Sequence, residues 1–163
     1  MTQLIQPRSS GPTIATMAQG PMPPWRNDEE AEDYARDPRG FLLDCCSIWL
    51  PHCEVMHNLV LCATYFLPAF EILANGSKFF RADKTHDEAL WQGKVGLVIA
   101  KGPLAFVDEP TAGVFFRGQN VNVGDWVQWD IHDARQSTIG RIHCRDVKDT
   151  QIIRKWSDPR LVY

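Results

Sequence analysis

A long hydrophobic run is absent from this chain, and so is a signal for secretion. A membrane-spanning helix needs about 20 consecutive apolar residues, whereas polar residues interrupt the most apolar region, residues 41–70, at short intervals. The opening residues, MTQLIQPRSSGP, lack the apolar core of a signal peptide. We therefore expect no membrane partner and no secretion through a signal peptide.

An excess of charge of one sign is also missing. The formal net charge is −3 over 163 residues, so the chain carries no overall electrostatic footprint for nucleic acid, and we expect no such partner. Charge is nevertheless uneven along the sequence. Eight acidic side chains lie between Asp28 and Glu54, while basic side chains with interleaved aspartates fill the last thirty residues. These regions are either two solvated faces or complementary surfaces of neighbouring subunits.

The cysteine count is odd, which argues against a framework of closed disulfides. Five cysteines in a chain without a secretion signal indicate a reducing compartment. The densest group of soft metal ligands has the spacing C-C-x5-H-C-x3-H and consists of Cys45, Cys46, His52, Cys53 and His57. Zinc sites usually contain a C-x2–4-C knuckle. Adjacent cysteines on a strand would not form one, because their side chains point to opposite faces. We expect buried thiols here, with neither metal nor cofactor.

Catalytic motifs and phosphate-binding glycine loops are absent too. The strongest acid–base candidates are Asp130, His132 and Asp133, which lie together in WDIHDAR. Cys62 and Cys144 are the candidate nucleophiles. A catalytic triad needs an acid, a histidine and a nucleophile in contact, and no local pattern brings them together. We predict a polar hairpin at WDIHDAR and a protein that is not an enzyme.

The sequence does contain a rhythm of short β-like segments and tight turns between Gln92 and Ile153. In VNVGDWVQW, residues 121–129, Gly124 and Asp125 mark a turn, and residues that strands favour follow it. Further predicted strands are GKVGLVIAKGP, TIGRIHCRDV, TQIIRKW and NLVLCATYF. Regularly spaced short strands without a long helical period predict a mainly β fold, either a small antiparallel barrel or a sandwich.

Two regions are expected along the chain. Residues 1–40 are predicted to form an extended Pro/Gly-rich arm with a short acidic helix, DEEAEDYARD, which Asn27 or Asp28 caps and Pro38 ends. Ordering a backbone residue costs roughly 1–2 kcal/mol, so we expect the arm to become ordered by wrapping adjacent subunits. Residues 41–163 are predicted to form the β domain, and its first apolar segment, residues 41–50, fits either a strand or a short helix.

The order of these segments resembles the GroES-like co-chaperonin family, and most of all its divergent bacteriophage versions. PHCEVMHNLVLCA corresponds to the family's first strand, which follows a proline-rich opening. A loop expected over residues 68–77 leads into the tripeptide Lys78-Phe79-Phe80, at the place of the family's mobile loop. GKVGLVIAKGP and VNVGDWVQW correspond to two later strands, and the resemblance covers about residues 51–156.

The resemblance implies a GroES-like small antiparallel β-barrel that forms rings, commonly of seven, and binds a chaperonin through the tripeptide of its mobile loop. Recognition of this kind places an extended apolar peptide in a groove. The tripeptide of this chain departs from the family's pattern, because Lys78 replaces an aliphatic residue and Phe79 and Phe80 replace branched ones.

Two hypotheses for function follow. The first is a non-enzymatic structural protein of a bacteriophage particle, of the capsid decoration or cement type, which self-associates and binds other virion proteins. It would lie in the host cytoplasm during assembly and then in the virion. The alternative is a phage-encoded co-chaperonin that caps a host chaperonin ring and assists folding of the capsid protein.

Aromatic side chains supply the candidate contacts, because aromatic residues are enriched where proteins bind one another. Trp126 and Trp129 lie three residues apart, so a regular strand places them on opposite faces, one in the core and one free for a neighbour. The candidate partner-binding residues are Lys78, Phe79, Phe80, Trp25, Phe115, Phe116 and Trp126.

Overall fold

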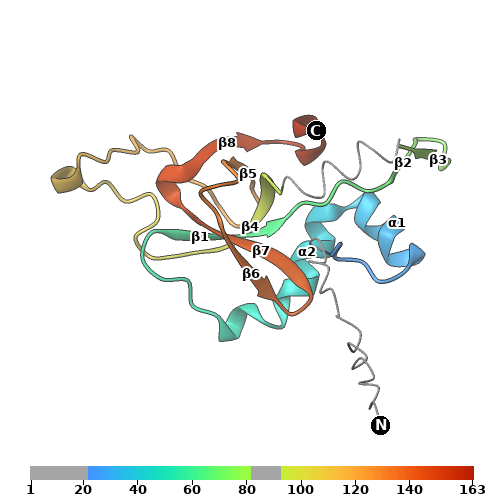
Figure 1. Cartoon of the computed structure of the whole chain (residues 1–163), viewed down its shortest axis with the longest axis horizontal. Helices are drawn as coiled ribbons and strands as arrows, with labels where there is room; N and C mark the ends of the chain where they lie inside the picture. Colours follow the sequence, from blue (N-terminus) through green and yellow to red (C-terminus); the bar gives the residue numbers. More distant parts are fainter. Residues whose placement is uncertain (1–21, 82–92) are drawn as a thin grey trace, which may run out of the picture.

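The computed structural model describes residues 22–81 and 93–163 (Figure 1). Most of the predicted arm, residues 1–21, lies outside the described residues, and so does the polar connection between the tripeptide and the next strand. Within the described ranges the protein is mainly β and antiparallel, as predicted. No helix in these ranges is long and apolar enough to cross a membrane.

Six strands form one sheet, in the order β6-β7-β1-β4-β5-β8, and two more form a separate hairpin. The strands of the sheet are β1 (Leu59–Thr64), β4 (Val95–Lys101), β5 (Trp126–Trp129), β6 (Arg135–Ile139), β7 (Ile142–Lys148) and β8 (Ile152–Trp156). The hairpin consists of β2 (Phe70–Ile72) and β3 (Lys78–Phe80). The predicted strands are confirmed, except that TIGRIHCRDV divides at the Gly140 turn into the end of β6 and most of β7, so β6 was not predicted as a separate strand. The loop predicted over residues 68–77 contains β2, because Phe70 pairs with Phe80 across the hairpin.

The sheet is strongly curved. Three strands separate β7 from β8 in the sheet order, yet only the short 3-10 helix η3 (Asp149–Gln151) joins them along the chain. The sheet must therefore curl until the end of β7 reaches the start of β8. Register shifts in β1 and β5 assist this bending. Among the described strands β6 and β8 remain the two edges, so these pairings do not close the sheet into a barrel.

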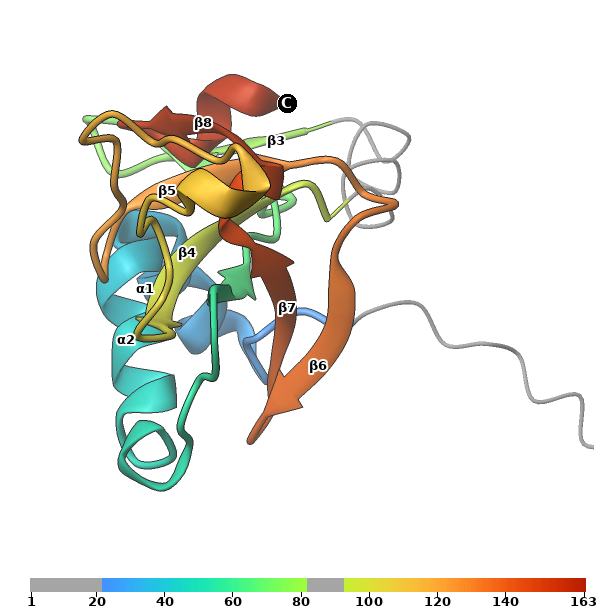
Figure 2. The ribbon, with the colours of Figure 1, turned by 90° about the vertical axis from the view of Figure 1, so that its left-hand side faces the viewer.

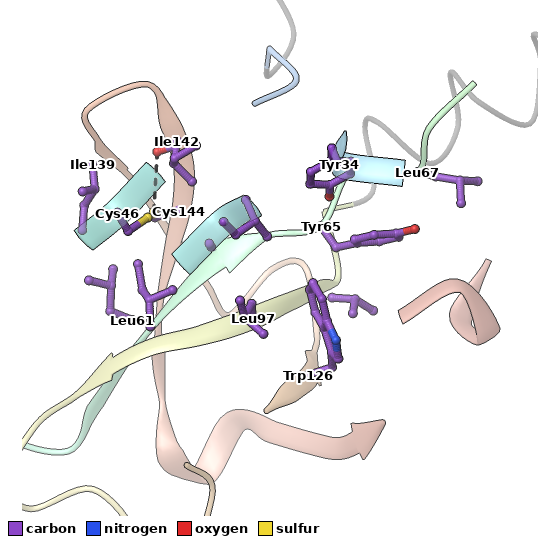
Figure 3. Close-up of a cluster of buried hydrophobic side chains, with 14 residues drawn as sticks. Tyr34, Cys46, Leu61, Tyr65, Leu67, Leu97, Trp126, Ile139, Ile142 and Cys144 are labelled. Atoms are coloured by element: carbon purple, nitrogen blue, oxygen red, sulfur yellow. Dashed lines mark hydrogen bonds between the residues drawn. The ribbon is translucent and has the colours of Figure 1, made fainter. Parts of the chain in front are cut away.

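The central strands β1 and β4 of the curled sheet are buried on both faces, and their successive side chains alternate between these faces. In β1, Leu61 and Ala63 face the helices, while Val60 and Cys62 face the inside of the curl. The helix-side cluster is shown in Figure 3 and includes Tyr34, Leu42, Cys46, Leu97, Trp126, Ile142 and Cys144. The inner cluster includes Val98, Val127, Trp129 and Val147. Two buried faces explain why the sequences of β1 and β4 are almost continuously hydrophobic.

Two helices cover the outer face of the sheet (Figure 2). Helix α1 (Asp28–Arg36) is the predicted acidic helix, and the Asn27 side chain caps it by accepting a hydrogen bond from the Glu30 N–H at 2.8 Å. Helix α2 (Pro38–Ser47) begins directly afterwards, with Pro38 in its first turn. The segment over residues 41–50, for which a strand and a helix were both open, is therefore mainly helical.

The helices belong to the body of the protein rather than to an extended arm. Leu42 and Cys46, four residues apart on α2, lie on one face and are fully buried in the helix-side cluster. The boundary predicted between residues 40 and 41 falls inside α2. At the other end of the chain, η4 (Pro159–Val162) and Tyr163 pack on the same side, with the Tyr163 ring 6.1 Å from that of Tyr65.

Candidate protein-binding surfaces

The predicted tripeptide lies on the β2–β3 hairpin, which projects from one end of the molecule (Figure 1). Phe79 is 61% exposed and Phe80 is 68% exposed. The tight turn between the strands is stabilised by the Asn75 side chain, which accepts hydrogen bonds from the N–H and hydroxyl of Ser77, and by Gly76 at φ +81°. Interactions within the turn thus stabilise the hairpin, and its two phenylalanines face solvent.

Lys78 has a different role from its two neighbours. Its Nζ lies 2.6 Å from a carboxylate oxygen of Glu32 on α1 and 4.9 Å from the centre of the Phe70 ring. The hydrogen bond from Lys78 lowers the pKa of the Glu32 carboxyl. On the other strand, Glu71 pairs with Arg81 and Arg160. The lysine therefore helps to anchor the hairpin on the body, which leaves Phe79 and Phe80 as the exposed apolar contacts.

A second projection, residues 102–124, leaves the sheet between β4 and β5 at the opposite end of the molecule (Figure 1). We call it the excursion loop. Its base is fixed by the buried carboxylate of Asp149, which accepts hydrogen bonds from the Phe106 N–H at 2.9 Å and from the Asn58 side chain at 3.0 Å. Phe106 adopts a left-handed conformation at φ +61°, which is uncommon outside glycine and fixes the direction of the loop.

The excursion loop exposes four large apolar side chains to solvent: Leu104, Val107, Phe115 and Val123. Phe115 is 58% exposed. Phe116, also a candidate contact, is only half-buried because its ring packs on Phe106 at 5.1 Å between centres. Of this predicted pair, Phe115 is the freer side chain.

Neither predicted tryptophan contact is a fully free surface residue. Trp126 and Trp129 do lie on opposite faces, as their spacing predicted, but both are buried. Trp126 packs edge to face on Tyr65, with ring centres 5.4 Å apart, and the prediction that it contacts a partner is wrong. Trp25 is partly buried, since it packs on Tyr34 at 4.9 Å. The helices cover one face of β5, and the inside of the curled sheet covers the other. The alternation of side chains along a single strand does not show whether both of its faces are buried.

The candidate catalytic groups occupy ordinary structural positions. Asp130, His132 and Asp133 form the turn between β5 and β6, where the Asp130 side chain accepts a hydrogen bond from the His132 N–H at 3.1 Å. Burial raises the pKa of Cys144 to about 12 and that of Cys62 well above its ordinary value. A thiol with a raised pKa is a poor nucleophile at neutral pH, because the thiolate is the reactive form.

The Cys/His group predicted to be a cluster of buried thiols is divided between elements. Cys45 and Cys46 lie on α2, where Cys45 is half-buried and Cys46 is buried with a pKa raised to about 11 by desolvation. Cys53 is exposed, so the prediction of burial is wrong for this residue. Over residues 22–81 and 93–163, no group of three or more His, Cys, Asp or Glu side chains could hold a metal ion.

Sequence reasoning missed an ion pair between α1 and the turn joining β6 to β7. Arg141 donates to a carboxylate oxygen of Glu30 at 2.7 Å, and this hydrogen bond lowers the pKa of the Glu30 carboxyl. Part of the acidic segment therefore meets part of the basic C-terminal region within one chain. The complementary charge of the two segments was visible in the sequence, but not which residues pair.

The described residues form two separated projections that expose apolar side chains from one sheet domain. Such an arrangement can bind two protein surfaces at once, because each projection ends in exposed side chains that other chains can bury. No family model matches the chain, and no curated protein matches it either.

Proposed function

We propose that the chain is a non-enzymatic assembly protein of a bacteriophage particle, of the capsid decoration or cement type. It self-associates and binds neighbouring virion subunits through its N-terminal arm and its two projections. It is present in the host cytoplasm during assembly and then in the virion.

One observation carries this proposal: the β2–β3 hairpin and the excursion loop expose large aromatic side chains at opposite ends of the molecule (Figure 1). Burying a large apolar side chain contributes about 1.5–3 kcal/mol relative to leaving it in water. A few such residues can dominate the affinity of an interface. A subunit with one binding surface forms a pair, whereas a subunit with a binding surface at each end can connect its neighbours into a ring or lattice.

A GroES-like barrel is the fold we propose for this assembly protein. The four segments that carry the family resemblance fall on β1, the β2–β3 hairpin, β4 and β5, in that order. The strong curvature between β7 and β8 supports the proposal, since only η3 joins strands from distant places in the sheet. The excursion loop leaves between β4 and β5, where the resemblance places a hairpin excursion.

The experiment compares incorporation of variants into particles that assemble with their full set of structural proteins. Deletion of residues 1–21 is preferable to a deletion through residue 27, because Trp25 packs on Tyr34 and Asn27 caps α1. Incorporation should fall in this deletion, in Phe79→Ser/Phe80→Ser and in Phe115→Ser. Ile153→Ser, which removes an exposed apolar side chain from β8 outside both projections, is the matched control. Wild-type incorporation of all three test variants would contradict the proposal.

A co-chaperonin is the second candidate function, and the exposure of Phe79 and Phe80 on a projecting hairpin favours it. This hairpin holds the tripeptide that resembles the mobile-loop motif. The candidate function predicts ATP-dependent capture of the protein by a chaperonin ring. Phe79→Ser/Phe80→Ser should abolish capture, while Phe115→Ser should leave it intact. Absence of capture of the wild-type protein would eliminate this function and leave the assembly role standing.

A further inference from the structure

A groove of about 840 Å³ lies between the first described residues, helix α2 and the turn that joins β6 to β7. Its lining includes Pro23, Pro24, Trp25, Ile48, Trp49 and Arg141. We call it the Trp49 groove. It is separate from both the β2–β3 hairpin and the excursion loop.

The walls of the Trp49 groove are held in place by contacts within the body. Trp25 packs on the buried ring of Tyr34 at 4.9 Å. Trp49 lies against Gly140, where a Cβ atom would come within 2.5 Å of the indole nitrogen. Arg141 is fixed by its 2.7 Å hydrogen bond to Glu30. A groove with fixed walls can bind a ligand without first being ordered.

The surface of the groove favours binding of an apolar, uncharged ligand. Ile48 is 73% exposed, Met22 is 70% exposed and Trp49 is 51% exposed, and all three line the groove. Adjacent exposed side chains of this size are typical of a binding surface. The charged side chains of the lining are Arg26, Asp44 and Arg141. Arg141 is paired with Glu30, which leaves one side chain of each sign and no excess charge to favour a charged ligand.

The chain itself supplies a segment with the matching chemistry. Residues 1–21, which precede the wall of the groove at Met22, contain one charged side chain, Arg8. Within them Ile14 and Met17 are apolar, and the Gly20-Pro21 pair favours a turn directly before Met22. Met17 is five residues from Met22, a reach of at most about 17 Å.

We propose that the Trp49 groove binds residues 14–17 of its own chain, with Ile14 and Met17 covering Trp49 and Ile48. A short tether gives an effective concentration of about 1 mM, so even an intrinsic Kd of about 0.1 mM keeps the groove about 90% occupied. A second copy or another protein would have to displace this segment. The inference goes beyond the proposed function, because residues 14–17 dock within one subunit and need no particle, while the residues before them would remain available to neighbouring subunits.

Cys45 is a natural reporter, because it lines the Trp49 groove and is half-buried, whereas Cys53 is exposed and lies outside the groove lining. The experiment measures the rate at which iodoacetamide alkylates each thiol of the full chain, by mass spectrometry of peptides. Occupancy of about 90% slows a reaction at a covered site about tenfold. Deleting residues 1–21 should therefore raise the Cys45 rate about tenfold and leave the Cys53 rate unchanged.

Two substitution variants keep the test independent of the deletion. Ile14→Ser/Met17→Ser should raise the Cys45 rate as the deletion does, while Leu4→Ser/Ile5→Ser should not. Equal Cys45 rates in the wild type, the deletion and Ile14→Ser/Met17→Ser would overturn the proposal. Protection of Cys45 that disappears on dilution would also overturn it, since a second copy would then supply the occupant. Protection that persists in a monomer would support it even if self-association failed.

Discussion

Tyr34 joins the helical layer to the sheet through a single buried hydroxyl group. The Phe66 N–H, just beyond the end of β1, donates a hydrogen bond to the Tyr34 oxygen at 3.0 Å. The side chain is fully buried, and desolvation raises its pKa well above the ordinary value. Tyr34→Phe should lower the free energy of unfolding by about 1–3 kcal/mol, because a buried N–H loses its partner. Urea denaturation measures the change.

Tyr65→Phe is the matched control for this prediction. The Tyr65 ring stacks on Tyr34 at 6.0 Å and is equally buried, but its hydroxyl has no hydrogen bond to any residue that the structure describes. Removing this hydroxyl should change the stability by less than removing that of Tyr34. An equal loss in both variants would show that the Tyr34–Phe66 hydrogen bond is not what stabilises this contact.

The lowered pKa of His143 makes the stability of the folded protein depend on pH. Its Nδ1 lies 3.0 Å from the Thr64 hydroxyl, and desolvation, followed by the nearby charge of Arg145, lowers its pKa below the ordinary value of 6.5. The unfolded chain therefore binds a proton at a higher pH than the folded chain. The contribution of neutral His143 to the stability of the fold is therefore complete above pH 6.5. It is lost as the pH falls through the lower pKa that His143 has in the folded chain.

Urea midpoints measured between pH 7.5 and pH 5 should fall with pH in the wild type and vary less in His143→Gln. The carboxyls with lowered pKa values contribute mainly below this window, because the ordinary pKa is 4.5 for Glu30 and Glu32 and 3.8 for Asp125 and Asp158. Identical pH profiles in wild type and variant would show that another group controls the dependence.

Helix α2 is the element whose role differs most from expectation. Leu42 is fully buried between α2 and the sheet, whereas Ile48 at the end of α2 faces solvent. Leu42→Ala should lower the free energy of unfolding by about 2–5 kcal/mol, because it removes apolar contacts and leaves a cavity. Ile48→Ala should change it by about 0.5 kcal/mol or less. Chemical denaturation of both variants tests whether α2 is part of the folded body, and equal small effects would contradict this.

Most of the strands could be predicted from the sequence because their boundaries are chemically marked. Gly102 and Pro103 end β4, and Gly124 and Asp125 precede β5. The turn at Gly140 was missed, because TIGRIHCRDV was predicted as one strand although it contains the end of β6, the turn and most of β7. Helix α2 was ambiguous because its apolar residues follow no single period. Its start is nevertheless marked by Pro38 in the first turn and by Asp37, whose side chain accepts a hydrogen bond from the Gly40 N–H at 3.0 Å.

At the scale of the whole molecule, exposure was the property that the sequence did not reveal. Phe79, Phe80 and Phe115 are exposed, while Trp126, of the same chemical class, is buried. The difference depends on how far the sheet curls and on which face the helices cover. Both follow from pairings between distant segments, such as Leu59 with Lys148. Local patterns predict strands and turns but not contacts at such separations.

The two projections give the molecule its proposed function, because each exposes apolar side chains on a rigid body and they lie far apart (Figure 1). Their separation means that one projection can remain engaged when the other is altered. Phe79→Ser/Phe80→Ser and Phe115→Ser should therefore each weaken self-association without unfolding the sheet.

The most direct test of self-association is the native mass of the purified full chain, measured over a range of protein concentrations. We expect a homo-oligomer for the wild type and for Ile153→Ser. Smaller species should appear for Phe79→Ser/Phe80→Ser and for Phe115→Ser at the same concentrations. A wild-type protein that remains monomeric at every concentration would contradict the account.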